Sequence, residues 1–126
     1  MVVGLGVDVV EVARVERLLA RHGDRSLDRV FSPGEIAYCR SYRRSAERFA
    51  GRFAAKEAIL KALGTGLSGG IGWTDVEVVH EAGGRPGVVL HGRARVVADG
   101  LGAVRWWLSI SHTHAHAMAC AVAESA

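Results

Sequence analysis

Residues 45–64 read SAERFAGRFAAKEAILKALG, and the architecture of the chain is built around this stretch. Ser45 is of the type that caps a helix N-terminus, and Gly64 is of the type that ends a helix. Between them, apolar side chains suited to a buried helix recur at Phe49, Phe53, Leu60 and Leu63. The pattern predicts a helix over residues 45–63, the longest helix expected in the chain.

A strand is predicted at the start of the chain. Residues 2–7 are apolar, and Gly4 and Gly6 would allow another backbone to approach closely. Asp8 is expected to end this strand. From Val9 to about His22, apolar positions recur at helical spacing and arginines share another side, so an amphipathic helix with a basic outer face is predicted.

A second helix start lies in the segment FSPGE, residues 31–35. Ser32 is an N-cap residue, Pro33 suits the first helical position, and Glu35 stands where it can close a capping box. These signals predict a helix from Pro33 to about Tyr42.

The second half of the chain is richer in strands. Five glycines between residues 64 and 72 predict a loop, which matches neither the P-loop nor the dinucleotide-binding pattern. Beyond it the sequence predicts two hairpins and one helix, with strands at 74–80, 87–91, 105–111 and 115–122 and the helix at 92–101. Helices early and hairpins late predict an α+β domain with helices packed on a small antiparallel sheet.

Length and composition limit the classes of protein. The 126 residues make a single domain, residues 1–126, and 49% hydrophobic with 23% charged residues is typical of a globular chain. The Gly-rich uncharged run 64–74 is too short to span a membrane, and the N-terminus lacks signal-peptide features, which predicts a cytoplasmic protein. A net charge of +3 does not indicate nucleic-acid binding. Cys39 and Cys120 are expected to be reduced.

Two acidic residues are candidates for a metal site. Asp8 follows an apolar strand, where a helix cap or a turn is the more ordinary role. A hard cation such as Mg²⁺ prefers one or two carboxylates, with phosphates and waters completing its shell, so Asp8 and Glu57 are a possible pair. Glu57 and Lys61 stand one helical turn apart, and Arg48, Arg52 and Lys56 form a separate basic row. A functional segment and a solvated helix with an ordinary Glu57–Lys61 pair are both possible interpretations of this stretch.

Three histidines alternate at positions 112, 114 and 116. Alternation would place them on one side of an extended strand, so a zinc site is conceivable, but no fourth ligand stands nearby. A single histidine at the tip of the hairpin, acting as a general base or a phosphate contact, is favoured.

Taken together, these segments resemble the AcpS-type family of 4′-phosphopantetheinyl transferases. The resemblance rests on Gly6-Val7-Asp8, the block from Arg52 to Gly66 and Ser109-Ile110-Ser111-His112, with Phe31–Glu35 and Gly84–Pro86 in support. It covers nearly the entire chain in order, and the long block is its most specific part.

The resemblance implies a fold, an activity and an assembly. It implies a compact α+β subunit with the 4′-phosphopantetheinyl transferase fold, a homotrimer, and coenzyme A bound where subunits meet. It implies Mg²⁺-dependent transfer of 4′-phosphopantetheine from coenzyme A to a serine of apo acyl carrier protein, giving the holo-protein and 3′,5′-ADP in fatty acid biosynthesis. A broader-range transferase for other carrier domains and a non-catalytic coenzyme A or anion-binding module are the alternatives.

The resemblance also implies roles for particular residues. Asp8 and Glu57 match the Mg²⁺ ligands, and Glu57, Lys61 and His112 are the implied catalytic residues. The implied contacts to coenzyme A are Arg44, Arg52, Lys61, Gly64, Gly66, Ser111 and His112. Arg14 and Arg21 match a basic face that docks the carrier protein. Glu57 and His112 are both left as the candidate proton acceptor, while His114 and His116 are not landmarks of the family and are assigned no role.

Overall fold

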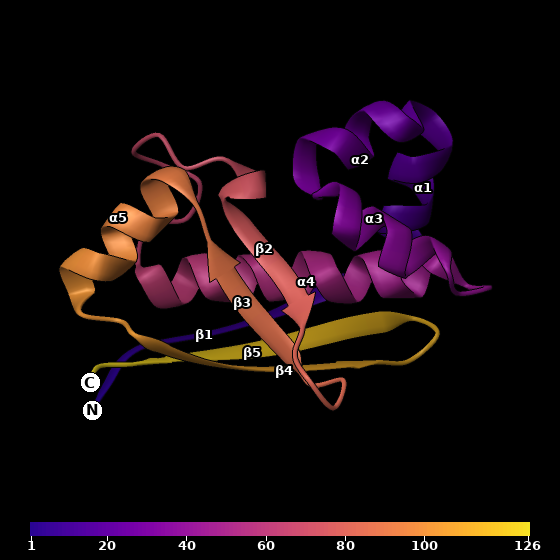
Figure 1. Ribbon diagram of the computed structural model, residues 1–126. Helices are drawn as coiled ribbons and strands as arrows, with labels where there is room; N and C mark the ends of the chain where they lie inside the picture. Colours follow the sequence, from indigo (N-terminus) through magenta and orange to yellow (C-terminus); the bar gives the residue numbers. More distant parts are fainter.

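The computed structural model describes all residues from 1 to 126. The chain begins with strand β1, passes through four helices, and ends in strands around a fifth helix (Figure 1). The elements are β1 (Val2–Glu11), α1 (Val12–His22), α2 (Asp24–Val30), α3 (Pro33–Arg40), α4 (Ser45–Leu63), the 3-10 helix η1 (Trp73–Asp75), β2 (Val76–His80), β3 (Pro86–Leu90), α5 (Gly92–Leu101), β4 (Arg105–His112) and β5 (His116–Glu124). None of the helices combines the length and apolar character that crossing a bilayer requires.

The predicted α+β class is confirmed. Strands β1, β5 and β4 form an antiparallel sheet in that order, and β2 pairs with β3 in a separate hairpin. In Figure 1, α4 runs along one face of the three-stranded sheet, no helix covers the opposite face, and α1, α2 and α3 gather over the N-terminal part of α4. The long helix is therefore the centre of the core, as its sequence predicts.

Strand β1 lies directly against α4 because it carries two glycines. A Cβ atom on Gly6 would lie 1.9 Å from the carbonyl oxygen of Ala58, and one on Gly4 would lie 2.2 Å from that of Ala62. Any side chain at either position would force the strand away from the helix. This close approach, which the sequence predicts, brings the residue after Val7 alongside the C-terminal half of α4.

The boundary between the first strand and the first helix was predicted wrongly. Asp8 does not end β1, because the strand continues to Glu11 and pairs with β5 from Asp8–Ala119 to Glu11–His116. Helix α1 consequently starts at Val12 rather than Val9. The ladder hydrogen bonds outweigh the helical spacing of the apolar residues. Helix α2 was not predicted at all, and α3 ends at Arg40, two residues early.

Helix α4 contains a buried ion pair that its sequence does not suggest. Lys56 and Glu35 are both essentially inaccessible to solvent, and Lys56 Nζ lies 2.8 Å from Glu35 Oε1. The ammonium also donates to the carbonyl oxygens of Trp73 and Val76. Glu35 Oε2 accepts from the Val78 amide at 2.9 Å. Reading Lys56 as an exposed residue was wrong, since the pair joins α3, α4 and β2.

Glu35 also forms the predicted capping box. Its Oε1 accepts a hydrogen bond from the Ser32 amide at 2.8 Å, and its own amide donates to Ser32 Oγ at 3.2 Å. One carboxylate thus starts α3 and neutralises Lys56.

Burial of Cys39 gives a pH-dependent expectation. Desolvation, opposed by the nearby Arg52 cation, raises the pKa of this thiol from 9.0 to about 12. Between pH 9 and 12 the folded state therefore holds a proton that the unfolded state loses, so stability should fall as pH rises, by up to about 1.4 kcal/mol per unit. In a Cys120→Ala background, thiolate absorbance should appear near pH 9 only after denaturation. Native titration near pH 9 would contradict this expectation.

Candidate active site

The first cluster of candidate site residues joins β1 to α4. Lys61 Nζ lies 3.1 Å from Asp8 Oδ1 and donates to the carbonyl oxygen of Val7 at 3.0 Å. Glu57 is one turn before Lys61 on the same helix. The Gly6–Ala58 contact places the strand here, so residues separated by about fifty positions in sequence meet at one place.

Asp8 and Glu57 are close enough to influence each other electrostatically. Partial burial is the main cause that raises the pKa of Glu57 above its ordinary value, and the negative charge of Asp8 raises it further. The positive charges of Lys61 and Arg14 act in the opposite direction. Two partly desolvated carboxylates that repel one another are a suitable place for a divalent cation.

Two carboxylates with no further protein ligand are a donor set that suits Mg²⁺. No third carboxylate, histidine or cysteine joins the pair, and no such group of three occurs anywhere in the structure. Mg²⁺ commonly takes one or two carboxylates and fills its remaining positions with waters and substrate phosphates. The same finding applies to His112, His114 and His116, which are not part of any group of three such side chains that could hold a metal ion.

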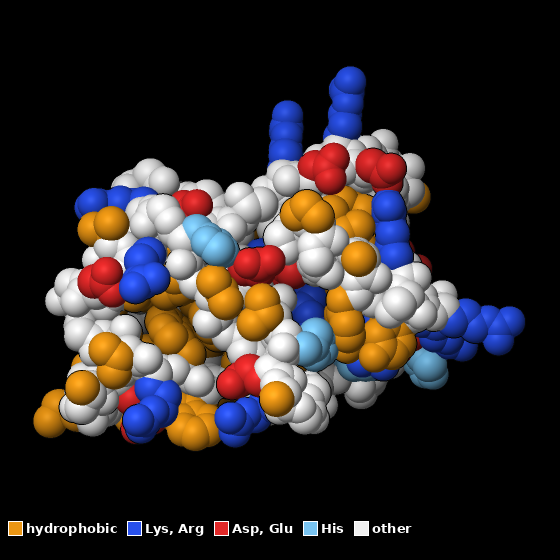
Figure 2. Space-filling model, viewed as in Figure 1, with side chains coloured by type: hydrophobic (Ala, Val, Ile, Leu, Met, Phe, Trp, Pro, Cys, Tyr) orange, Lys and Arg blue, Asp and Glu red, His pale blue; other side chains and the backbone are white.

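A second polar cluster lies at the other end of α4. His112 Nδ1 lies 3.3 Å from Glu47 Oε1, and His114 Nδ1 lies 3.6 Å from the same oxygen. Arg44 contacts His114 Nδ1 at 2.8 Å and Glu47 Oε2 at 3.8 Å. A hollow of about 290 Å³ opens here, lined by Tyr42, Arg43, Arg44, Glu47, Arg48 and His112. In Figure 2 basic side chains and a histidine project from this end of the molecule.

A single chain does not bring these two clusters together. Glu47 and Glu57 are ten residues apart on α4, which corresponds to about 15 Å along the helix axis. Gly64 and Gly66 follow Lys61 by three and five positions, at the end of α4 that carries the first cluster, and both have positive φ. Ser111 is exposed on the strand face opposite the one that carries His112.

Arg52 takes a different position from the one expected for a nucleotide contact. Its side chain is buried, with one guanidinium nitrogen 2.7 Å from His80 Nε2 and the guanidinium carbon 4.2 Å from the centroid of the Tyr38 ring. The predicted contact of Arg52 with coenzyme A therefore requires these interactions to open.

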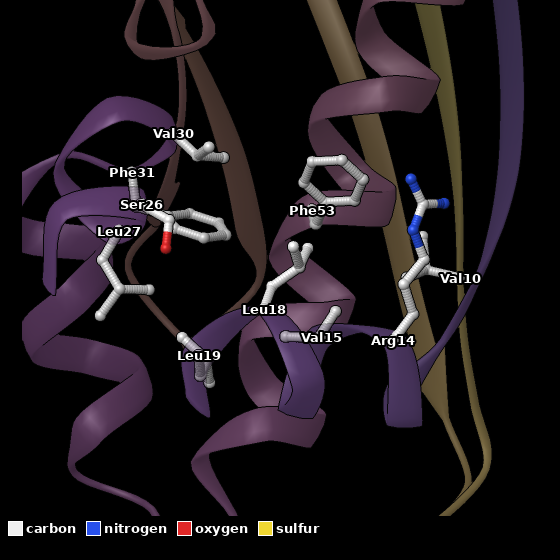
Figure 3. A pocket seen from close by; sticks show the side chains of 10 residues that line it. All are labelled: Val10, Arg14, Val15, Leu18, Leu19, Ser26, Leu27, Val30, Phe31 and Phe53. Atoms are coloured by element: carbon white, nitrogen blue, oxygen red, sulfur yellow. The ribbon is translucent and has the colours of Figure 1, made fainter. Parts of the chain in front are cut away.

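A small apolar pocket lies beside α1. Figure 3 shows side chains of α2 and of Phe31, which follows it, on one side of the pocket, with side chains of α1 and Phe53 of α4 opposite and Arg14 at the edge. The pocket measures about 60 Å³ and is lined by Val10, Arg14, Val15, Leu18, Leu19, Ser26, Leu27, Val30, Phe31 and Phe53. Arg14, Arg17, Leu18 and Arg21 line an adjacent basic hollow. The predicted basic face of α1 thus borders an apolar recess.

Comparison with known families defines the class of protein. The family model described as the 4′-phosphopantetheinyl transferase superfamily matches residues 4–121. The chain belongs to this superfamily, and the resemblance seen in the sequence is confirmed. A relative from Koribacter versatilis, named holo-[acyl-carrier-protein] synthase, is 52% identical over 124 residues, covering 98% of this chain and 99% of the relative.

The solved structures that match this chain bear the same name as this relative. The crystal structure of holo-[acyl-carrier-protein] synthase from Neisseria meningitidis matches with a TM-score of 0.88 at 32% identity, covering 99% of this chain and 100% of that one. The Helicobacter pylori holo-[acyl-carrier-protein] synthase, solved in complex with coenzyme A, matches with a TM-score of 0.83 at 30% identity, covering 95% and 99%. The predicted transferase fold is therefore confirmed.

Glu47 is the residue near this site that sequence reasoning missed. An acidic residue in the first turn of a helix is common because it interacts favourably with the helix dipole, so Glu47 carries no functional signal by itself. Its partner His112 lies 65 positions later, and only the packing of β4 on α4 makes the pair visible.

Proposed function

We propose that this chain transfers 4′-phosphopantetheine from coenzyme A to a serine of apo acyl carrier protein, releasing 3′,5′-ADP. The observation that carries the proposal is the meeting of Asp8, Glu57 and Lys61 at the contact between β1 and α4. Relatives over nearly the whole chain bear the name holo-[acyl-carrier-protein] synthase, and related structures are described as complexes with coenzyme A.

The residues divide the work of phosphoryl-type transfer between them. Asp8 and Glu57 would hold Mg²⁺, which when bound supplies positive charge to the diphosphate of coenzyme A. Lys61, whose ammonium contacts Asp8 at 3.1 Å, would add a positive charge at the same place. Positioning and charge neutralisation are the main requirements of such a transfer, and this inventory meets them. Glu57 and His112 are the groups able to accept the serine proton.

The activity is tested by weighing the carrier protein. Apo carrier protein is incubated with the chain, coenzyme A and Mg²⁺, and its mass is measured. A gain of one phosphopantetheine group supports the transferase, whereas coenzyme A binding without a gain supports the non-catalytic module. Use of peptide- or polyketide-synthase carrier domains at equal rates would favour the broader-range enzyme. Cytoplasmic location and a role in fatty acid synthesis remain predictions.

The sheet surface opposite α4 favours assembly with further copies. This outer sheet face exposes the apolar side chains of Leu5, Val7, Val9, Trp107 and Met118. Contiguous exposed apolar side chains usually mark an interaction surface. Assembly would also let one copy supply the Asp8 cluster and another the His112 cluster, which a single chain keeps apart. We therefore keep the homotrimer as part of the proposal.

We expect Met118→Glu to break this assembly. A charge placed on the outer sheet face would be desolvated in an interface, which is strongly unfavourable. Light scattering should give the original chain a mass near three times 13.4 kDa and the variant a mass near one chain. Val96→Glu on α5, an equally exposed apolar position away from the sheet, is the matched control. A monomeric original chain would contradict the trimer.

We expect Arg21→Glu to weaken use of the carrier protein. Arg21 belongs to the proposed docking face of α1 and, unlike Arg14, does not act on Glu57, so its reversal leaves the metal site intact. Loss of charge complementarity should raise KM for the carrier about tenfold at low salt, with a smaller effect at high salt. Arg29→Glu on α2 makes the same charge change outside this face. An unchanged KM in Arg21→Glu would remove the residue from the docking surface.

A further inference from the structure

His112 Nδ1 is the one buried side-chain nitrogen or oxygen in the structure without a hydrogen bond. Glu47 Oε1 lies 3.3 Å away, near enough for an ion pair, but the direction is not that of a hydrogen bond. Buried polar atoms nearly always have a partner, and a small rotation of either side chain would make this one. The proposed reaction gives no role to this contact between His112 and Glu47.

The chemistry of the pair indicates which ring nitrogen carries a proton. A carboxylate can only accept a hydrogen bond, so a partner facing Glu47 Oε1 must donate. Glu47 is itself buried, with 8% of its surface exposed, which limits competition from water. His112 is therefore expected to carry its proton on Nδ1 when the ring is neutral.

His114 does not compete for this role. Its Nδ1 lies 2.8 Å from an Arg44 guanidinium nitrogen, and arginine has donors only. Nδ1 of His114 must then be the acceptor and has no proton to offer to Glu47. Its side chain is also largely exposed, unlike that of His112.

The other nitrogen of His112 remains free. Nε2 makes no hydrogen bond in the structure and is not among the buried unpaired atoms, and His112 lines the hollow next to Arg44 and Arg48. With Nδ1 held by Glu47, Nε2 is the atom presented to a substrate in that hollow.

We infer that Glu47 is a positioning residue for His112: it holds the Nδ1 proton and the ring orientation, so that Nε2 meets the substrate. This inference rests on the proposed function and adds a residue to it. Neutral Nε2 accepts a proton from a hydroxyl group, and the protonated ring donates from Nε2 to a phosphate oxygen. Both uses require the same ring orientation, so the inference holds for either role of His112.

The position of Glu47 on α4 is suited to orienting the His112 ring. A helix in the centre of the core fixes its backbone more rigidly than a loop would, and supporting residues act through such rigid placement. His112 is the last residue of β4, where the strand leads into the 113–115 turn. Without a contact of this kind the ring would be free to rotate.

The test uses the full chain with Glu47→Gln, which keeps the shape and removes the charge. Two-bond ¹H–¹⁵N spectra of protein with labelled histidines report the tautomer of His112, assigned by comparison with His112→Ala. In the original chain we expect Nδ1 to be protonated and Nε2 not. In Glu47→Gln we expect loss of this preference, and kcat lower by about ten- to a hundredfold, the range found when the outer partner of a metal-bound histidine is removed. His114→Ala is the matched control and should leave the His112 tautomer unchanged.

A double variant separates positioning from folding. If Glu47 acts through His112, Glu47→Gln should lower kcat no further in a His112→Ala background. A loss of kcat that persists in that background, or an unchanged His112 tautomer in Glu47→Gln, would overturn the inference. If Glu47→Gln does not fold, the spectra of Glu47→Asp decide in its place, since a His112 tautomer insensitive to the shortened carboxylate would also overturn it. The spectra need no carrier protein, so failure of the proposed transfer activity would be recognised separately by mass.

Discussion

Glu57→Gln is expected to reduce transfer to the carrier protein by about a thousandfold or more, which is several kcal/mol of transition-state stabilisation. The amide cannot supply the negative charge that would hold a cation beside Asp8. Turnover at saturating coenzyme A and ordinary Mg²⁺ concentrations, followed by the mass of the carrier protein, measures the effect. Turnover like that of the original chain would refute the role of Glu57.

The same variant should keep its fold. Burial and the neighbouring Asp8 charge raise the pKa of Glu57, so the folded state disfavours the ionised form of this side chain. Removing the charge is therefore expected to leave the thermal midpoint near pH 7 unchanged or slightly higher. Glu81→Gln makes the same chemical change at the exposed β2–β3 turn, where the Glu81 side chain forms an ion pair with Arg85 alone. This control should alter neither activity nor stability.

Lys56→Ala is expected to have the largest effect on stability. It leaves the Glu35 carboxylate buried without its positive partner and opens a cavity, and breaking a buried ion pair on one side typically costs about 3–5 kcal/mol. For a domain of this size, the thermal midpoint should fall by roughly ten degrees or more. Denaturant unfolding and calorimetry measure both quantities.

A second substitution tests the physical cause. Lys56→Met combined with Glu35→Gln removes both charges while keeping similar volumes, and should recover much of the stability lost in Lys56→Ala. Arg95→Ala disrupts an exposed ion pair with Asp99 on α5 and should cost no more than about 1 kcal/mol. A loss in Lys56→Ala as small as that of Arg95→Ala would contradict the importance of the buried pair.

Local sequence signals predict the helices best where several signals coincide. Helix α4 ends at Leu63 as predicted, and α3 starts with the predicted capping box. The predicted cap of α4 was wrong, because Ser45 is already helical and the N-cap residue is Arg44, whose side chain makes no cap hydrogen bond. N-cap residues, proline at the first position and glycine at the end act through nearby backbone groups, so the sequence alone is sufficient. The β1–α1 boundary was wrong because Asp8–Glu11 satisfy their backbone through β5, more than a hundred residues away.

The site residues also differ in how far the sequence predicted their positions. Asp8, Glu57 and Lys61 were recognised as a set because residue types and spacing resemble those of a known family, and Glu57 and Lys61 share a helix turn by local geometry alone. Burial of Arg52 and Lys56 contradicts the interpretation of this row as a solvated helix face, one of the two that the sequence left open. No local pattern distinguishes a lysine that faces solvent from one that meets Glu35.

The amino-acid order was enough to indicate the α+β class and the end of the central helix, because these depend on neighbours within a few positions, and resemblance to a known family indicated the candidate residues of the reaction. The pairing of Lys56 with Glu35, the approach of Asp8 to α4 and the contact of His112 with Glu47 arise only when distant segments pack. Each joins residues at least 21 positions apart, and burial sets the strength of these contacts by removing water from charged groups.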